Sequence, residues 1–213
     1  MKLYYHPLST YCQKVLIALY EKGLEFEPEL VNLMDEESRA KYREIYPIGK
    51  IPCLVLDDGH IIPESSIIIE YLDPLAKPGL IKGNAEQIRK IRFKDRVFDF
   101  YLNDAVSTLV MQGMKPDAEQ NKESIERARF HVDTMYRLME NEFGKQPYAN
   151  GGEFLLSDCA AAPPLFYAEK IAPFSGHKNI SAYWDRLRSR PSIQRTHDEA
   201  APFLAAFAKQ SAA

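Results

Sequence analysis

The chain has 213 residues, and its 46% apolar and 27% charged residues suffice for a substantial core in one large domain or two small ones. Its net charge of −3 excludes the strongly basic character of a protein that binds nucleic acid through many phosphate contacts. The first residues lack the apolar run of a secretory signal, and no stretch approaches about 18 uninterrupted apolar residues, so we expect neither secretion nor a membrane span.

The first part of the chain alternates extended and helical patterns. Short apolar runs that stop at proline indicate strands, and capping hydroxyls before an apolar-periodic run indicate a helix. The predicted elements are a strand over Lys2–Tyr5, a helix from Ser9 and Thr10 to Gly23, a strand over Phe26–Val31 and a polar helix or irregular segment over Glu36–Tyr46.

A hairpin and a helix complete this part. Strands over Cys53–Leu56 and His60–Ile62 are joined by Asp57-Asp58-Gly59, a tight-turn signal. A helix is predicted over Ser66–Leu72, although its run of three isoleucines alone favours a strand. In the resulting βαβαββα order the first two strands are parallel, because a helix crosses between them, and the last two are antiparallel.

The remainder of the chain is predicted to be helical. Two prolines and two glycines between residues 74 and 83 indicate a linker, which we place at 76–83 between domains 1–75 and 84–213. Residues 1–75 carry 7 basic against 13 acidic side chains and the rest carries 20 against 17, which supports two domains. The predicted helices run from the Asn84 cap to about Met114, from Asp117 to Phe143 with an end at Gly144, and over Ser157–Ile171, Ile180–Ser189 and Ile193–Ala208. The third is apolar almost all round and is expected at the centre of a bundle.

The hairpin region carries a possible ligand site. Pro52 lies at the mouth of a strand, where proline is tolerated only at an edge, a strand start or a special turn. A cis Ile51–Pro52 bond would point the Ile51 backbone outward to pair with an extended, peptide-like ligand, whereas an ordinary edge proline would not. Glu64 and Ser65 follow at a helix start, where they could hold an amino-acid head group or merely cap the helix.

A second possible site is the turn from the first strand into the first helix, at Ser9, Thr10 and Cys12. Free N–H groups and the helix dipole stabilise an anion there, and a serine hydroxyl can donate to it. A ligand thiol in this place would lose its proton more easily, and the thiolate is the nucleophile. The Ser-x-x-Cys spacing also resembles half of a redox motif, while a small buried side chain is the alternative interpretation of Cys12.

The three cysteines are Cys12, Cys53 and Cys159. They are too few and too scattered for a disulfide framework and have no metal-ligand spacing. We therefore expect a reducing, cytoplasmic environment and no metal site.

These features together resemble the cytosolic glutathione S-transferases over essentially the whole chain. Each matching stretch is weak alone, but their order and spacing are specific. They read STYCQKV at 9–15, ALYEKG at 18–23, PIGKIPCL at 47–54, PESSIIIEYL at 63–72, SDCAAA at 157–162 and RPS at 190–192. The resemblance implies a thioredoxin-like N-terminal domain, an all-helical C-terminal domain, a homodimer and glutathione as co-substrate.

The resemblance also implies roles for particular residues. Ser9 falls where serine-type transferases place the hydroxyl that holds the glutathione thiolate. The backbone of Ile51, before a cis Pro52, would pair with the cysteinyl part of glutathione. Glu64 and Ser65 would bind its γ-glutamyl end.

Other contacts are less determined by the resemblance. Lys50 could reach a carboxylate, but no residue is assigned to the position where many relatives hold the glycine carboxylate. Some classes use a tyrosine near the end of the first strand as the thiolate donor, so Tyr5 rivals Ser9, with Thr10 and Cys12 as further candidates. Leu155 stands where relatives carry a capping Ser or Thr, so the sequence departs from the family at this position and does not predict the reciprocal bond of a capping box with Asp158.

The implied activity is the activation of glutathione for attack on a small electrophilic or hydrophobic substrate, with no nucleic-acid or membrane partner. The alternatives are a glutathione-dependent isomerase, peroxidase or thiol-disulfide reductase, and a non-catalytic binding protein of the same fold. The second substrate is expected near Leu8, residues 101–114 and Tyr167.

Overall fold

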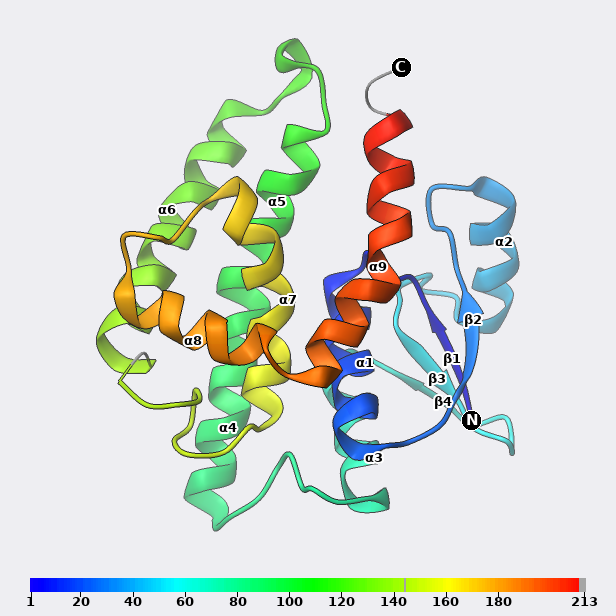
Figure 1. The fold of residues 1–213 in the computed structure, drawn as a ribbon. Helices are drawn as coiled ribbons and strands as arrows, with labels where there is room; N and C mark the ends of the chain where they lie inside the picture. Colours follow the sequence, from blue (N-terminus) through cyan, green and yellow to red (C-terminus); the bar gives the residue numbers. More distant parts are fainter. Residues whose placement is uncertain (144, 211–213) are drawn as a thin grey trace.

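The computed structural model describes residues 1–143 and 145–210, and its first part is a four-stranded sheet flanked by helices (Figure 1). Local signals explain where the elements begin and end. Ser9 caps α1, and Gly23 ends it in a left-handed conformation with φ 62°. The elements are β1 (Lys2–Tyr5), α1 (Thr10–Lys22), β2 (Glu27–Leu30), α2 (Glu36–Ile45), β3 (Cys53–Val55), β4 (Ile61–Pro63) and α3 (Ser65–Leu72).

The sheet has the order β2-β1-β3-β4. β1 pairs with β2 in parallel and with β3 antiparallel, and β3 and β4 form the antiparallel hairpin. The predicted βαβαββα order is therefore confirmed, and the segment left open between helix and irregular structure is the helix α2. The strand predicted from His60 instead begins at Ile61. His60 belongs to the turn, in which its carbonyl accepts a hydrogen bond from the Leu56 N–H at 2.9 Å.

Helices cover both faces of the sheet. Tyr42 of α2 packs with Val31 and Cys53 on one face. On the other face, Leu3 and Tyr5 of β1 belong to the main core with α1 and α3. This three-layer arrangement places α1 between the sheet and the helices of the second part (Figure 1).

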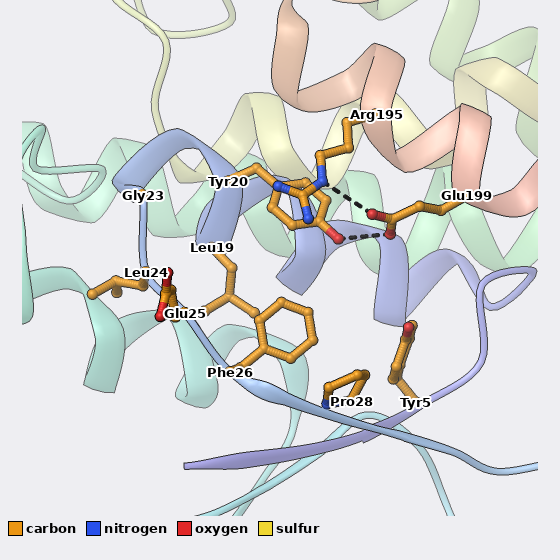
Figure 2. A pocket seen from close by; sticks show the side chains of 10 residues that line it. All are labelled: Tyr5, Leu19, Tyr20, Gly23, Leu24, Glu25, Phe26, Pro28, Arg195 and Glu199. Carbon is orange, nitrogen blue, oxygen red and sulfur yellow. Dashed lines mark hydrogen bonds and ion pairs between the residues drawn. The ribbon is translucent and has the colours of Figure 1, made fainter.

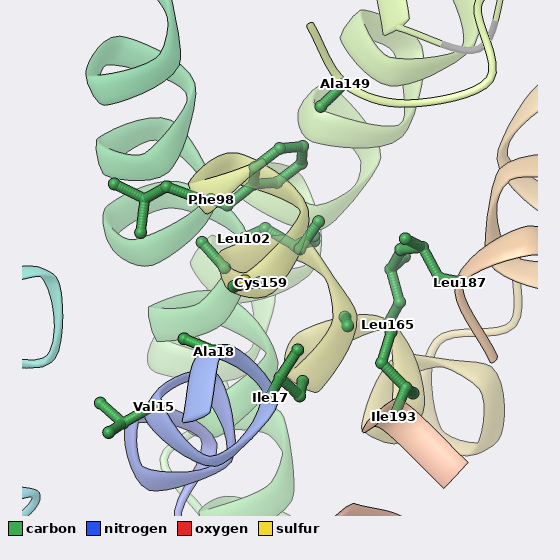
Figure 3. Packing of buried hydrophobic residues seen from close by; sticks show 14 of the residues in the cluster. Val15, Ile17, Ala18, Phe98, Leu102, Ala149, Cys159, Leu165, Leu187 and Ile193 are labelled. Carbon is green, nitrogen blue, oxygen red and sulfur yellow. The ribbon is translucent and has the colours of Figure 1, made fainter. Parts of the chain in front are cut away.

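The second part is a bundle of helices, as predicted. α7 lies at its centre, and Figure 3 shows Cys159 and Leu165 of α7 packed with Ile17 and Ala18 of α1. The elements are α4 (Ala85–Val97), the π-helical η2 (Phe98–Asn103), α5 (Asp104–Gly113), α6 (Lys122–Leu138), the π-helical η4 (Met139–Phe143), α7 (Leu156–Ile171), α8 (Lys178–Arg188) and α9 (Pro191–Gln210), with 3-10 turns η1 (Asp73–Leu75) and η3 (Asp117–Glu119).

Two helices differ from the sequence prediction by more than a shift of one or two residues at an end. The helix predicted from Asn84 to about Met114 is divided by the π-turn η2. The helix predicted from Asp117 begins only at Lys122, because Asn121 caps it by accepting from the Ser124 N–H at 2.9 Å. Its predicted end at Gly144 lies outside the described residues.

Asp158 caps α7 without the usual partner. Its carboxylate accepts hydrogen bonds from the Leu155 N–H at 2.9 Å, the Ala149 N–H at 2.8 Å and the Tyr183 hydroxyl at 2.6 Å. The return bond runs from the Asp158 N–H to the Leu155 carbonyl at 2.9 Å, since leucine has no side-chain acceptor. Burial raises the pKa of Asp158 to about 6, although these bonds oppose the shift.

A buried ionic cluster joins α1 to the bundle. Lys14, which is 1% exposed, lies 2.6 Å from Asp95 Oδ1 and 2.7 Å from Asp99 Oδ2. Its ammonium also donates to Ser66 Oγ of α3 at 2.8 Å, and Arg96 pairs with both carboxylates from the solvent side. Burial raises the pKa of Asp99, whereas the Lys14 charge lowers it. Two buried carboxylates are thus held by two cations at the junction of α1, α3, α4 and η2.

Candidate functional site

A cleft of about 670 Å³ opens between the first turn of α1, the segment after β2, and helices α5, α7 and α9. Most of its lining is apolar, and α5 and α9 contribute more residues to it than the other elements do. The cleft is lined by three residues of the predicted glutathione site, Ser9, Thr10 and Ile51. It is also lined by Leu8, Tyr167 and residues of α5, which lie in the regions where the second substrate was expected. The cleft therefore joins the possible anion site at α1 to an apolar compartment.

Ser9 is the N-cap of α1 and lines this cleft. Its Oγ accepts a hydrogen bond from the Cys12 N–H at 3.4 Å. A hydroxyl has one proton to donate in addition to its acceptor lone pairs, so capping leaves that proton for the Cys12 thiol, with which the Ser9 side chain also interacts, or for an anion in the cleft. Within the described part of the chain, the Thr10 and Tyr11 N–H groups have no hydrogen-bond partner. An anion beside Ser9 would meet a hydroxyl donor and the positive end of a helix dipole.

The loop before β3 presents a free backbone to the same cleft. The Ile51–Pro52 peptide bond is cis. The Ile51 N–H and C=O have no hydrogen-bond partner among the described residues, and the Tyr42 hydroxyl fixes the loop by donating to the Lys50 carbonyl at 2.6 Å. An extended ligand could therefore pair with Ile51.

Glu64 and Ser65 lie at the start of α3. Glu64 has φ 69°, a left-handed value that is uncommon for a residue with a side chain, and such conformations cluster at functional sites. Its side chain is exposed, whereas Ser65 is buried. Neither residue lines the 670 Å³ cleft, and nor do Lys50 and Pro52. The structure thus brings Ser9 and Ile51 together and leaves the other four proposed contacts outside this lining.

Tyr5, the rival of Ser9, faces a different groove. Figure 2 shows its ring among Phe26, Pro28 and Glu199, in a groove of about 480 Å³ between β2, α1 and α9. Burial raises the pKa of the Tyr5 phenol, and the Glu199 charge adds to this. Tyr5 does not line the cleft that holds Ser9.

The cysteines of the first part are not exposed to either groove. Cys12 is fully buried, and burial raises the pKa of its thiol to about 12. Burial also raises the pKa of Cys53. Since the thiolate is the reactive form, these thiols are poor nucleophiles at neutral pH.

Sequence reasoning did not single out Tyr11 and Asp104, two polar residues of the cleft, although Asp104 falls within residues 101–114, which were expected near the second substrate. The Tyr11 hydroxyl donates to Asp104 Oδ1 at 3.0 Å and contacts the Asp99 carbonyl at 3.3 Å. Burial raises the pKa of Tyr11, so it remains a neutral donor. The sequence signals were the position of Tyr11 two residues after Ser9 and the place of Asp104 within residues 101–114. Nothing in the sequence paired the two residues, because they lie 93 positions apart.

The described residues contain no group of three or more His, Cys, Asp or Glu side chains that could hold a metal ion. None of the helices they form is long and apolar enough to cross a bilayer.

Comparisons with known proteins agree over both parts of the chain. Residues 3–79 match the family model "Glutathione S-transferase, N-terminal domain", and residues 102–191 match "Glutathione S-transferase, C-terminal domain". Glutathione S-transferase F10 of Arabidopsis thaliana is 30% identical over 87% of this chain and 91% of its own length. Maleylacetoacetate isomerase of Pseudomonas aeruginosa is 27% identical over 92% of this chain and 95% of its own. The crystal structure of a glutathione S-transferase from Methylobacillus flagellatus with GSH bound is similar with a TM-score of 0.83 and 28% identity, covering 92% of this chain and 98% of that one.

Proposed function

The chain belongs to the glutathione S-transferase family, and we propose that it transfers glutathione to small electrophilic or hydrophobic substrates through a thiolate held by Ser9. The observation that carries the assignment of Ser9 is its place as the N-cap of α1 in the apolar cleft, with a hydroxyl proton still available. We further propose residues 1–75 as the glutathione-binding domain and 84–213 as the helical domain.

Glutathione would lie extended from α3 to α1. Glu64 would pair with the ammonium of the γ-glutamyl group, while Ser65 and the α3 N-terminus would hold its carboxylate. The free Ile51 N–H and C=O would pair with the cysteinyl backbone, as an added strand pairs with a sheet edge. We propose exposed Lys50 as a partner of the glycine carboxylate. These contacts would place the sulfur at Ser9.

The chemical role of Ser9 follows from hydrogen bonding to charge. A donor stabilises the thiolate more than the neutral thiol, so it lowers the thiol pKa from its free value of about 8.5. The sulfur then forms a bond to the electrophilic carbon of the substrate, and a leaving group departs with the electron pair of its bond. No thiol of the chain takes part, since Cys12 and Cys53 are buried, which disfavours the reductase alternative.

A homodimer in the cytoplasm is part of the proposal. Ile67 and Tyr71 of α3, Phe93 of α4 and Phe100 of η2 are exposed apolar side chains that a second copy of the chain would cover. Three free cysteines suit a reducing compartment. Light scattering tests the assembly, and a monomer at micromolar concentration would contradict it.

The test of the proposed donor is the pKa of bound glutathione in Ser9→Ala. A hydrogen bond to a charged group is worth about 1.5–3 kcal/mol, which corresponds to a rise of about one to two pH units. Thiolate absorbance in the ultraviolet, followed against pH in the complex, measures it directly. Affinity should fall little, because the γ-glutamyl and backbone contacts remain.

Tyr5→Phe and Thr10→Ala are the matched controls, since each changes one rival hydroxyl. Both should titrate like the parent. If Tyr5→Phe shifts the curve and Ser9→Ala does not, the tyrosine is the donor and the serine assignment is wrong.

A further inference from the structure

We infer that the cleft selects neutral or cationic apolar electrophiles over anionic ones, and that Asp104 makes this selection. The inference rests on the proposed transferase function and assigns its substrate class. Three observations carry it: the charges that line the cleft, the position of Asp104, and the character of the facing walls.

The cleft contains one carboxylate and no fixed cation. Of the described residues that line it, Asp104 is the only acid, and none is Lys or Arg. His6, its one basic side chain, has its Nδ1 engaged as acceptor of the Leu8 N–H at 3.2 Å, and burial lowers its pKa. At neutral pH the lining therefore carries a net negative charge, to which a glutathione thiolate would add.

Asp104 lines the same cleft as Ser9 and is anchored to the first turn of α1. It is the first residue of α5, and its Oδ1 accepts from the Tyr11 hydroxyl at 3.0 Å. Tyr11 belongs to the first turn of α1, two residues beyond Ser9. Asp104 Oδ2 has no hydrogen-bond or ion-pair partner among the described residues, so it is available to a donor or a cation on a substrate.

The remaining walls discriminate little by shape. Met34, Met111 and Met114 lie at the cleft with exposed fractions of 79%, 51% and 37%. Phe203 and Leu204 of α9 form a further apolar wall. Methionine side chains are flexible and repack around different apolar bodies. With tolerant walls and one fixed charge, the cleft distinguishes substrates by charge, through repulsion of like-charged ones.

The expected effect is moderate because Asp104 is exposed to solvent. Two like charges several ångströms apart in such a setting change a rate or an affinity by about tenfold, and salt weakens the effect. Dicarboxylates, such as maleylacetoacetate, are therefore expected to be poor substrates.

The experiment uses three electrophiles with one reactive group. They are 4-chloro-3-nitrobenzoate, its neutral primary amide, and the amide bearing a trimethylammonioethyl group. In each, the glutathione sulfur bonds to the ring carbon and the chlorine leaves as chloride with the electron pair of the carbon–chlorine bond. Values of kcat/KM are divided by the rate constant for free glutathione thiolate, which removes the difference in intrinsic reactivity.

The corrected ratio of anionic to neutral substrate should be about 0.1 or lower in the parent and should rise about tenfold in Asp104→Asn. This variant keeps an acceptor for Tyr11 and removes the charge. Glu119→Gln removes an exposed carboxylate that does not line the cleft, and it should leave the ratio unchanged. A ratio near one in the parent, or one that Asp104→Asn does not change, overturns the inference.

Calorimetry with the three preformed glutathione conjugates separates this inference from the proposed function. It also gives a result if turnover is too slow to measure, because it follows binding and not reaction. Tight binding of all three conjugates with equal affinity would support a glutathione site and overturn the charge selection. Failure of every conjugate and of glutathione itself to bind would overturn the proposed function and this inference with it.

Discussion

Replacing Lys14 with methionine should destabilise the protein strongly, because it removes one of two cations from a buried cluster. Breaking a buried ion pair by removing one partner typically costs about 3–5 kcal/mol. Arg96 still contacts both carboxylates in this structure, at 2.8 Å to Asp95 and 3.0 Å to Asp99, so we expect the lower end, about 3 kcal/mol at pH 7. Urea unfolding of parent and variant measures the loss in free energy of unfolding, provided that the dependence of this free energy on urea concentration is the same for both.

The loss should shrink at lower pH. Without the Lys14 charge, which lowers the pKa of Asp99 against the effect of burial, that pKa should rise further above the unfolded value of about 3.9. The folded variant then binds a proton that the unfolded chain does not, so acidification stabilises it relative to the parent. The double variant Lys14→Met with Asp99→Asn should recover much of the stability at pH 7.

Lys41→Met is the matched control. Lys41 also pairs with a carboxylate, Glu37 at 2.6 Å, but both side chains are more than 70% exposed. Exposed pairs of this kind contribute about 0.3–0.5 kcal/mol. A loss below about 1 kcal/mol for Lys14→Met, or an equal loss at pH 7 and pH 5, would refute the argument from burial.

Three further predictions concern Asp158, Glu64 and the two cysteines of the first part. Burial raises the pKa of Asp158 to about 6 in the folded protein, against an ordinary value of 3.8, so the folded state takes up a proton first as the pH falls. Asp158 should therefore stabilise the fold by on the order of 2–3 kcal/mol as the pH falls from about 7 to 4. Urea unfolding of Asp158→Asn should lack this contribution, and an identical pH dependence in parent and variant would contradict the prediction. Glu64→Ala should weaken glutathione binding by about 1.5–3 kcal/mol in calorimetry, and unchanged affinity would remove Glu64 from the site. Cys12 and Cys53 should react with a thiol reagent only as fast as the protein opens, so rapid labelling of the folded protein at pH 7 would show that they are accessible.

Elements with local causes could be predicted from the sequence. Ser9 begins α1 and Gly23 ends it, because a capping hydroxyl and a left-handed glycine act within one turn. The turn before His60 closes with Gly59 at φ 85° for the same kind of reason. The parallel arrangement of the first two strands and the antiparallel arrangement of the last two followed from these boundaries and from the crossover rule, but the order of all four strands in the sheet was not predicted.

Features that depend on residues far apart in the chain could not be predicted from the sequence. Lys14 appears in the sequence as an ordinary polar position of an amphipathic helix, and its partners Asp95 and Asp99 lie more than 80 residues away. Alternation places Leu3 and Tyr5 on one face of β1 but does not reveal that Tyr5 opens to the groove at Glu199. Local signals indicated a peptide-like ligand at Ile51 and an anion at Ser9, but only the resemblance related these two places to one glutathione molecule, since spacing alone could not.

The π-turn η2 was hidden for another reason. Phe98, Leu102 and Val106 are spaced four residues apart, which continues the α-helical pattern without interruption. Figure 3 shows Phe98 and Leu102 packed beside α7, as they could also be in an α-helix, so the apolar pattern does not reveal the wider backbone turn.

This turn has a consequence for changes in chain length. A π-turn closes its hydrogen bond over one residue more than an α-turn, and each residue of an α-helix advances the side-chain direction by about 100°. Deleting one residue within η2, such as the exposed Tyr101, would let the helix continue as an α-helix with α4 and α5 both keeping their present faces. Deleting one residue of α4, such as the exposed Lys90, would instead turn one side of the helix by about 100° relative to the other. Among homologous chains, insertions and deletions of single residues should therefore be found at η2 and not in the helical turns of α4 and α5 beside it.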